Sequence, residues 1–426
     1  MKRLLSESVM TRATVGRALA AMSFLSVLFS CVSPVDKRTA SSPSSEWAPA
    51  AAVLVHTPGE ELFDGVVHPA AGLFESYFNV DSAAIEHRNF IKKLESKGIR
   101  VYRLMDVLRQ MDMEKLRELA SATLIYDASD VADSLSFGEN YRLETLSVMS
   151  REDLIRVLLF QPKVILHGTD NNTGVEADYM HRPLTNLYFL RDQSISTPRG
   201  QVICKMNSYQ RSPETRIIKA CYEQLGIAPV FEVTGDGRIE GGDYLPAGTV
   251  SFIGCGMRTN MEAIRQMMEA DVFGHDTVIV VNDHLRWQME MHLATHFNII
   301  DKDLCTMPLS RMEAKEGDPE YCTADIYVRE EGQKEYSLYR ENVGFVQTVK
   351  SMGYKIIPIC RTDELHYANN YLTIAPRHII AVKGQSEQYR KALEENGVTV
   401  EWLPLENLID GYGAAHCMTQ VIARYR

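Results

Sequence analysis

Residues 260–281, NMEAIRQMMEADVFGHDTVIVV, decide the fold class of this chain. Their first half has apolar residues at helical spacing, and their second half ends in a β-branched apolar run that is typical of a buried strand. The same order of helix, turn and strand recurs at 82–104, 339–359 and 386–405, where Gly397 marks the end of the last helix. Recurrence of one small unit predicts an α/β repeat architecture and argues against a two-lobed nucleotide-binding fold.

Short apolar strands are expected between these units, at 51–59, 164–168 and 378–384. No G-x-G-x-x-G motif follows a strand and the sequence has no P-loop, so nothing in it supports a phosphate-binding site. The stretch 107–163 interrupts the alternation of strands and helices, because it is charged and mainly helical in pattern. We therefore expect it to form an inserted helical subdomain.

The composition is that of an ordinary globular protein, since 45% of the 426 residues are hydrophobic and 24% are charged. Lys and Arg number 45 and Asp and Glu 56, which gives a net charge of −11. An acidic chain without a dense basic run is not expected to bind nucleic acid, and it suits a cationic or zwitterionic small ligand. The eight cysteines form no C-x-x-C pair and no zinc-ligand spacing, which argues against a metal site built on thiolates.

The first thirty-one residues resemble a bacterial lipoprotein signal peptide. A basic start leads into the apolar stretch ALAAMSFLSVLFS, which ends at Cys31, the expected site of lipidation. Residues 32–50 are rich in Ser, Pro and Thr and are expected to be a flexible tether to a folded body at 51–426. This organisation predicts a protein of the bacterial cell envelope, held at a membrane by a lipid anchor. The alternative is an unprocessed leader and a cytoplasmic protein.

Four short motifs carry groups that are suited to catalysis. They are NLYFLRD at 186–192, EGGD at 240–243, MHL at 291–293 and GAAHCM at 413–418. Together they supply a thiol, an imidazole and several carboxylates, and a thiol becomes a nucleophile only beside a base or a cation. Carboxylates next to it would hold and polarise a positively charged substrate. Each motif alone has an ordinary structural explanation as a core residue, a buried histidine or a turn.

Taken together and in this order, the motifs resemble those of the arginine deiminases. These enzymes belong to a wider superfamily of guanidino-modifying deiminases, amidinotransferases and dimethylarginine hydrolases. The resemblance runs from about residue 51 to the C-terminus and includes QRSPET at 210–215 and MHLATHFNIID at 291–301. It implies a closed, five-bladed, pseudosymmetric α/β propeller of ββαβ repeats, with the active site on its axis. An inserted helical subdomain, expected here at 107–163, is also a feature of arginine deiminases.

The resemblance also implies a role for each matched catalytic residue. Cys417 would be the nucleophile that attacks the guanidinium carbon, and His292 would protonate the departing ammonia and then activate water. Glu240 would hold the guanidinium and orient His292. Asp192 would bind two guanidinium N–H groups in a bidentate, charge-assisted pair.

A second group of matched positions would contact the rest of the substrate. The resemblance implies substrate-binding roles for Asn186, Phe189, Arg211, Asp243 and Arg258. It requires no metal ion and no organic cofactor, and it leaves the formation of a homo-oligomer open. The expected partner is a small guanidino or ureido compound.

Two positions depart from the family pattern and keep alternatives open. Ala294 stands where the family motif H-L-D has its Asp, and Tyr412 stands where arginine deiminases commonly have an Arg. The expected reaction is hydrolysis of arginine to citrulline and ammonia through a covalent thiouronium on the cysteine. One alternative is a hydrolase of citrulline or a related compound, because a ureide carbonyl oxygen would be repelled by a carboxylate at 294. Others are an amidinotransferase and a ligand-binding lipoprotein without activity.

Overall fold

The computed structural model describes residues 40–171, 173–330 and 332–425. Within them, the segment that decided the fold class forms one complete repeat. Strands β10 (Tyr244–Ala247) and β11 (Val250–Cys255) pair antiparallel, α9 (Met261–Glu269) follows, and β12 (Thr277–Asn282) returns parallel to β11. Asn260 caps α9 by accepting a hydrogen bond from the backbone N–H of Ala263, which fixes where the helix begins.

The same ββαβ pattern recurs in four further sheets of the described residues. Their strands are β7 (Ser194–Thr197), β8 (Gly200–Ile203) and β9 (Phe231–Glu232); β13 (Asn298–Asp301), β14 (Leu304–Pro308) and β17 (Lys355–Ile359); β18 (Leu372–Ala375), β19 (His378–Val382) and β20 (Thr399–Leu403); and β21 (Gln420–Tyr425), β2 (Ala50–Val55) and β3 (Arg100–Arg103). In each sheet an antiparallel pair is followed by a parallel strand. The predicted five-bladed α/β propeller is therefore confirmed.

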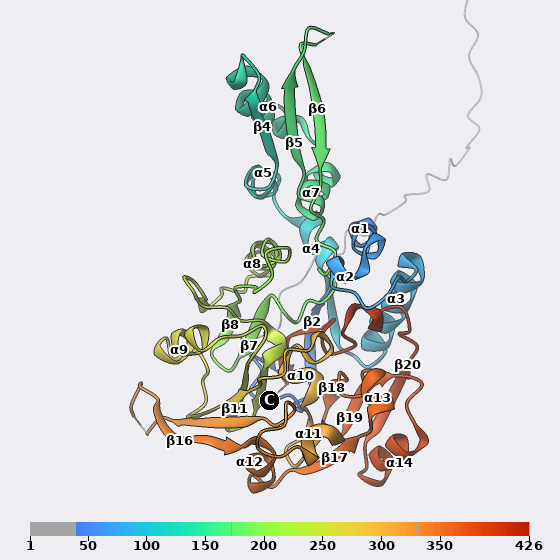
Figure 1. The fold of residues 1–426 in the computed structure, drawn as a ribbon, viewed down its shortest axis with the longest axis vertical. Coiled ribbons are helices and arrows are strands. Elements are labelled where there is room, and N and C mark those ends of the chain that lie inside the picture. The colour runs from blue at the N-terminus through green and yellow to red at the C-terminus, as the bar shows by residue number, and fades with distance from the viewer. Residues whose placement is uncertain (1–39, 172, 331, 426) are drawn as a thin grey trace, which may run out of the picture. The chain divides into compact units, whose positions relative to one another are not determined.

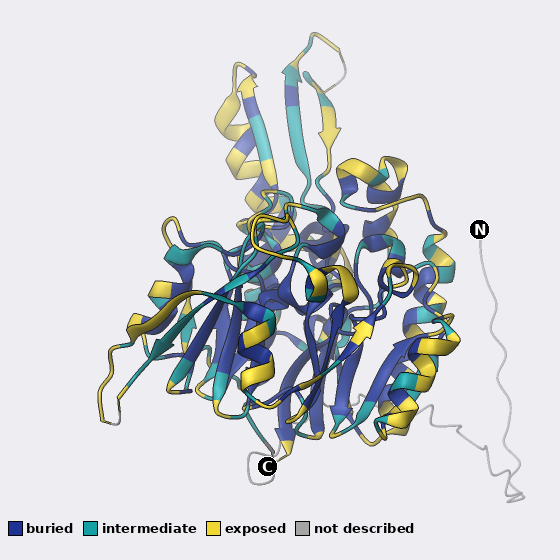
Figure 2. Ribbon diagram, turned by 60° about the horizontal axis from the view of Figure 1, so that its bottom comes forward, coloured by how far each residue is buried: buried dark blue, intermediate teal, exposed yellow. Residues whose placement is uncertain are grey.

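Helices pack outside these sheets and differ widely in length. Apart from α10 (Leu293–His296), whose residues are all buried, they are α1 (Phe63–Val67), α2 (Pro69–Gly72), α3 (Val80–Ser96), α4 (Leu104–Gln110), α8 (Glu214–Gln224), α11 (Leu309–Glu313), α12 (Phe345–Ser351), α13 (Arg361–Leu365) and α14 (Glu387–Glu395). Figure 2 shows the strands buried and the outer faces of these helices exposed. No helix in the described part of the chain is long and apolar enough to cross a bilayer.

The two ends of the described chain close the ring. The C-terminal strand β21 lies between β2 and a short N-terminal strand, β1 (Ala40–Ser41), and pairs antiparallel with both. The segment 32–50, expected to be a flexible tether, is therefore part of the fold from residue 40 on. Two contacts hold this segment in the fold. Strand β1 covers an edge of β21, and the carboxylate of Glu46, which is 2% exposed, pairs with the buried Arg191 and Arg424. The signal peptide expected at 1–31, with its lipidation site at Cys31, falls outside the described residues.

The insertion expected at 107–163 contains a sheet as well as helices. Helices α5 (Met113–Ser121), α6 (Tyr141–Val148) and α7 (Arg151–Phe160) are present. A single π-helical turn at Ser136–Asn140 directly precedes α6. Strand β4 (Ile125–Asp130), however, pairs with β5 (Lys163–Gly168), which pairs with β6 (Val175–Met180). A purely helical insertion is therefore wrong, because its middle segment finds strand partners beyond residue 163. The sheet projects away from the propeller blades (Figure 1).

One repeat differs from the expected order of elements. Residues expected to begin a helix at 339 instead continue strand β16 (Ser337–Gly344), which pairs with β15 (Thr323–Val328). Strand β15 in turn pairs with β12, so these two strands extend a neighbouring blade to five strands. Pairing along the sheet edge outweighs the weak helical pattern of this polar stretch.

Candidate active site

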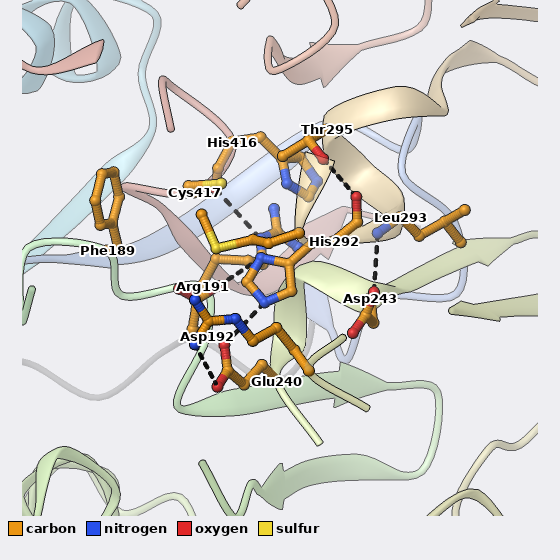
Figure 3. A network of polar contacts seen from close by, with 12 residues as sticks. Phe189, Arg191, Asp192, Glu240, Asp243, His292, Leu293, Thr295, His416 and Cys417 are labelled. Atoms are coloured by element: carbon orange, nitrogen blue, oxygen red, sulfur yellow. Dashed lines mark hydrogen bonds and ion pairs between the residues drawn. The ribbon is translucent and has the colours of Figure 1, made fainter. Parts of the chain in front are cut away.

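Three of the four predicted motifs line one pocket of about 290 Å³, and the fourth, EGGD, lies next to it through the bond of Glu240 to His292. It is lined by Leu73, Asn186, Phe189, Asp192, Arg211, Arg258, Gln288, Met291, His292, Gly411, Tyr412 and Cys417. Seven of these positions were named from the sequence as catalytic or substrate-binding. They come from loops far apart in the chain, and the closed ring of blades brings them together. Figure 3 shows the convergence around the imidazole of His292.

His292 forms a buried ion pair with Glu240. Its Nε2 lies 2.9 Å from Glu240 Oε2, and the two side chains are 1% and 0% exposed. Burial opposes the charged imidazole, but the charge of Asp192, the neighbouring Cys417 and the hydrogen bond to Glu240 raise the pKa of His292 well above its usual value. Burial also opposes the carboxylate, but the bond to His292 and the charge of Arg258 lower the pKa of Glu240 to about 2. An imidazolium facing a carboxylate results.

One carboxylate oxygen of Asp192 is bonded to Arg211, and the other is left free beside His292. Its Oδ2 accepts a hydrogen bond from Nη1 of Arg211 at 2.7 Å. Its Oδ1 lies 3.8 Å from Nδ1 of His292, and neither of these two buried atoms has a hydrogen-bond partner among the described residues. Because a buried polar atom without a partner is costly, the free Oδ1 of Asp192 suits a ligand that brings N–H donors.

Cys417 is held by a residue that sequence reasoning missed, Asn370. The amide Nδ2 of Asn370 donates to Cys417 Sγ at 3.1 Å. Its Oδ1 accepts hydrogen bonds from the backbone N–H groups of Ala414 at 2.8 Å and of Cys417 at 3.2 Å. One buried side chain therefore fixes both the thiol and the loop that carries it. The only signal in the sequence is the pair Asn369 and Asn370, which is separated from strand β18 by one residue.

The expected substrate-binding arginines are already paired within the protein. Arg211 contacts Asp192 and Glu214, with Nη2 2.9 Å from Glu214 Oε2, and also donates to two backbone carbonyls. Despite burial, these carboxylates raise the pKa of Arg211. Arg258 donates from Nη2 to Gln288 at 2.9 Å and lies 3.9 Å from Glu240, with its buried Nε unpaired among the described residues. Both guanidinium groups reach the pocket, as do Asn186 and Phe189.

Asp243 does not line the pocket with the other predicted residues. Its Oδ1 accepts the backbone N–H of Leu293 at 2.8 Å, and its Oδ2 accepts the hydroxyl of Thr259 at 2.6 Å. The first contact holds the start of α10, directly after His292. The structure therefore gives Asp243 a positioning contact, and the substrate-binding role expected of it stays a prediction. Burial raises the pKa of Asp243 to about 6, against the opposing charge of His292.

The two positions that depart from the family pattern differ in their surroundings. Ala294 is fully buried in an apolar cluster with Phe252 and Phe297, and it does not line the pocket. Tyr412 does line the pocket and has a left-handed backbone, with φ of 66°. The carboxylates around His292 are therefore Asp192, Glu240 and Asp243, without a fourth at 294.

The donor atoms of Asp192, Glu240 and His292 lie close enough together to hold a metal ion. Within this cluster Glu240 and His292 bond each other, and Asp192 bonds Arg211 through Oδ2. A thiol beside an imidazolium and fixed carboxylates suits nucleophilic attack on a cationic carbon centre.

Comparisons with solved structures give the fold of this chain. DDAH from Pseudomonas aeruginosa, in complex with citrulline, superposes with a TM-score of 0.52 at 15% identity, over 87% of this chain and 98% of that one. The N-terminal domain of ArgZ, an arginine dihydrolase of the ornithine–ammonia cycle in cyanobacteria, gives 0.53 at 15% identity, over 88% and 97%. Both matches support the propeller architecture.

Comparisons of sequence give the family. The arginine deiminase of Halobacterium salinarum is 27% identical over 92% of this chain and 98% of its own length. That of Metamycoplasma arthritidis is 26% identical, over 87% and 94%. The sequence model of the family described as "Arginine deiminase" matches residues 71–424, which span the catalytic motifs. On this match, and with a thiol, an imidazole and carboxylates in one pocket, the chain belongs to the arginine deiminase family.

Proposed function

We propose that this protein hydrolyses L-arginine to L-citrulline and ammonia through a covalent intermediate on Cys417. The observation that carries the proposal is the convergence of Cys417, His292 and Asp192 on one buried pocket, with Glu240 behind the imidazole. A guanidinium brings the N–H donors that the free Oδ1 of Asp192 lacks. The relatives named arginine deiminase support the same reaction.

In the first half of the reaction, Sγ of Cys417 attacks the guanidinium carbon and forms a C–S bond. The carboxylate of Asp192 holds the guanidinium edge, so that its carbon faces the sulfur. The C–N bond to a terminal nitrogen then breaks, and the protonated His292 gives that nitrogen its proton. Ammonia leaves, and a thiouronium remains on Cys417.

In the second half, water replaces the sulfur. The neutral imidazole of His292 accepts a proton from water, which attacks the thiouronium carbon and forms a C–O bond. The C–S bond breaks as the carbonyl forms, the second proton of the water passes to the solvent, the thiolate returns and citrulline leaves. Glu240 keeps His292 in one orientation through both halves, because its carboxylate stays hydrogen-bonded to Nε2.

The test is a substrate panel on the purified full-length protein. Arginine, agmatine, methylated arginines, peptidyl-arginine and citrulline are supplied in turn, and ammonia, citrulline and ornithine are quantified. We expect ammonia and citrulline in equal amounts from arginine. Cys417→Ser should abolish turnover, whereas Cys221→Ser, which changes a fully buried thiol in another cluster, should not. Retained turnover in a folded Cys417→Ser protein would remove the covalent mechanism.

The same panel separates the alternative activities. Release of ornithine from citrulline would favour a ureide hydrolase, for which the uncharged Ala294 is the supporting feature. Transfer of the amidino group to an added amine, without ammonia, would indicate an amidinotransferase. Binding of arginine without any product would indicate a ligand-binding protein.

A lipid anchor at Cys31 is the second part of the proposal. The basic start, the apolar stretch before Cys31 and the Ser- and Pro-rich residues after it support anchoring in the bacterial cell envelope. Cys31→Ala should move the protein from the membrane to the soluble fraction, because the N-terminal segment binds a bilayer only weakly without the acyl chains that Cys31 would carry. Ser30→Ala should leave the distribution unchanged. A wild-type protein that is already soluble and begins at Met1 would contradict the anchor.

A further inference from the structure

A second cluster of side chains that could bind a metal includes the last residue of α10, and none of its members lines the pocket of Cys417. Asp283, His296 and Cys322 each offer one donor atom, and these atoms all lie within 4.8 Å of one another. The sequence gives no hint of this cluster, because its members stand far apart and form no known ligand spacing.

Sheet register explains why two of these residues are neighbours. Strands β12 and β15 pair antiparallel, and their last paired residues are Asn282 and Thr323. Asp283 comes directly after β12, and Cys322 comes directly before β15, so the two residues leave the sheet at the same edge. His296 ends the short helix α10, which packs beside them.

His296 is the residue that points to a ligand. It is 2% exposed, and neither of its ring nitrogens has a hydrogen-bond partner among the described residues. Its Nδ1 lies 4.0 Å from Oδ2 of Asp283, too far for a hydrogen bond. Both residues line a small cavity that reaches His292.

Arg311 orders the other two donors. Its Nη1 donates to Asp283 Oδ1 at 2.9 Å and to Cys322 Sγ at 3.0 Å, and its Nη2 donates to Asp283 Oδ2 at 3.2 Å. Each carboxylate oxygen has two lone pairs, so Asp283 can keep Arg311 and still offer Oδ2 toward His296. A donor that is hydrogen-bonded behind the ligands in this way fixes the direction in which they face a metal ion.

The local charge also favours a cation. The carboxylates of Asp283 and Glu290 both contact Arg311, so two buried acids face one guanidinium.

We propose that Asp283, His296 and Cys322 form a binding site for a divalent transition-metal ion, of which Zn²⁺ is the best match. One nitrogen, one oxygen and one sulfur donor are a ligand set typical of zinc, and a fourth position is left open toward the cavity beside His292. The site is separate from Cys417 and does not depend on the proposed reaction.

The test uses Co²⁺, which reports thiolate ligation by a charge-transfer band. Full-length protein carrying Cys417→Ser is stripped with a chelator and titrated with Co²⁺ and then with Zn²⁺, so that the catalytic thiol cannot contribute. We expect one equivalent of Co²⁺ with a thiolate band that Zn²⁺ abolishes. Adding Cys322→Ser should remove the band and weaken metal binding by at least about 10–100-fold, the loss that removing a mere hydrogen-bond partner of a ligand typically causes. Adding Cys305→Ser, which removes a thiol in the same apolar cluster, should change neither.

Two outcomes would overturn the site. One is the absence of any thiolate band in the Cys417→Ser protein. The other is a band that persists after Cys322→Ser. His296→Gln is the second variant, read by Zn²⁺ affinity in case Cys322→Ser does not fold, and unchanged affinity in that variant also contradicts the site.

Discussion

At the scale of single residues, the thiol and the imidazole are each held by one buried polar partner. Asn370 donates to Cys417 Sγ, and Glu240 pairs with Nε2 of His292. Hydrogen bonds to charged groups are worth about 1.5–3 kcal/mol, and more is lost when a buried partner is left unpaired. These two contacts are therefore where single substitutions should alter activity most.

Replacing Asn370 separates its two contacts. Asn370→Ala loses both, and we expect kcat to fall by roughly 10–100-fold, since about 1.5–3 kcal/mol of stabilisation of the sulfur is lost. Asn370→Asp keeps an acceptor for the N–H groups of Ala414 and Cys417 but loses the donor to Sγ. It should therefore fold normally, but its Cys417 should react with iodoacetamide more slowly than Cys417 of the wild type. The measurements are kcat and the alkylation rate.

The control for this prediction is the neighbouring residue. Asn369 is equally buried, and its side chain contacts Thr306 in another blade. Asn369→Ala should lower stability without slowing alkylation of Cys417. Equal alkylation rates in Asn370→Asp and the wild type would contradict a role for the amide donor.

The pH profile should report the pair formed by His292 and Glu240. Because the pKa of His292 is raised, the imidazole stays protonated at neutral pH, and kcat/KM should fall as pH rises through that raised value. Glu240→Gln removes the carboxylate that favours the charged ring, so this alkaline fall should move to lower pH, and kcat should drop about 100-fold. The measurement is kcat/KM against pH.

A second buried pair provides the matched control. His56 Nε2 lies 2.8 Å from Glu61 Oε1, and both side chains are buried away from the pocket. Glu61→Gln should leave the alkaline fall of kcat/KM where it is. An unmoved profile in Glu240→Gln would show that His292 is not the group that titrates.

At the scale of elements, the loop that carries Cys417 depends on close packing. The nucleophile lies between the 3₁₀ turn Ile409–Gly411 and strand β21. A Cβ added at Gly411 would lie 1.8 Å from the hydroxyl of Tyr188. One added at Gly413 would lie 2.9 Å from Cβ of Cys417. These two glycines let the loop approach the NLYFLRD segment closely, which places the sulfur at the pocket.

Gly413→Ala should therefore damage catalysis more than stability. The new methyl group would also lie 3.1 Å from Sγ of Cys417 and 2.8 Å from the ring of Phe189, so the sulfur must shift. Misplacing a nucleophile by a fraction of an ångström to 1 Å costs up to about 100-fold in kcat. Gly397→Ala is the control, because φ of 68° makes it strained while open space surrounds it far from the site. It should lower Tm and leave kcat unchanged; a similar loss of kcat in both variants would contradict the argument.

At the scale of the whole molecule, the propeller is closed by its own two ends. Strand β21 lies between β1 and β2, and Glu46, just after β1, accepts from Arg191 at 3.3 Å and from Arg424 at 3.1 Å. Despite burial, these arginines and His416 lower the pKa of Glu46. The backbone N–H of Arg191 donates to the carbonyl of Cys417 at 3.0 Å, so the closure also supports the nucleophile.

Removal of the closing segment should unfold or inactivate the protein. A chain that begins at residue 40 should keep its Tm and kcat, whereas one that begins at residue 48 should lose both. Glu46→Gln alone should cost about 3–5 kcal/mol in the free energy of unfolding, because it leaves buried Arg191 and Arg424 without their carboxylate. Chemical denaturation measures this. Equal stability of the two truncated chains would contradict the closure.

The sequence by itself determined the repeat, because helix and strand periods are local properties that each ββαβ unit carries in full. It also determined the chemical groups of the site: the motifs around Asp192, Glu240, His292 and Cys417 matched one family, and seven named residues line one pocket. Only the tertiary structure showed that Asn370 holds the sulfur and that Asp243 holds a backbone N–H instead of facing the pocket. It also decided that residues from 40 on close the ring and that the insertion contains a sheet. These features depend on pairing between segments far apart in the chain, and burial and hydrogen bonding across such distances leave no local pattern in the sequence.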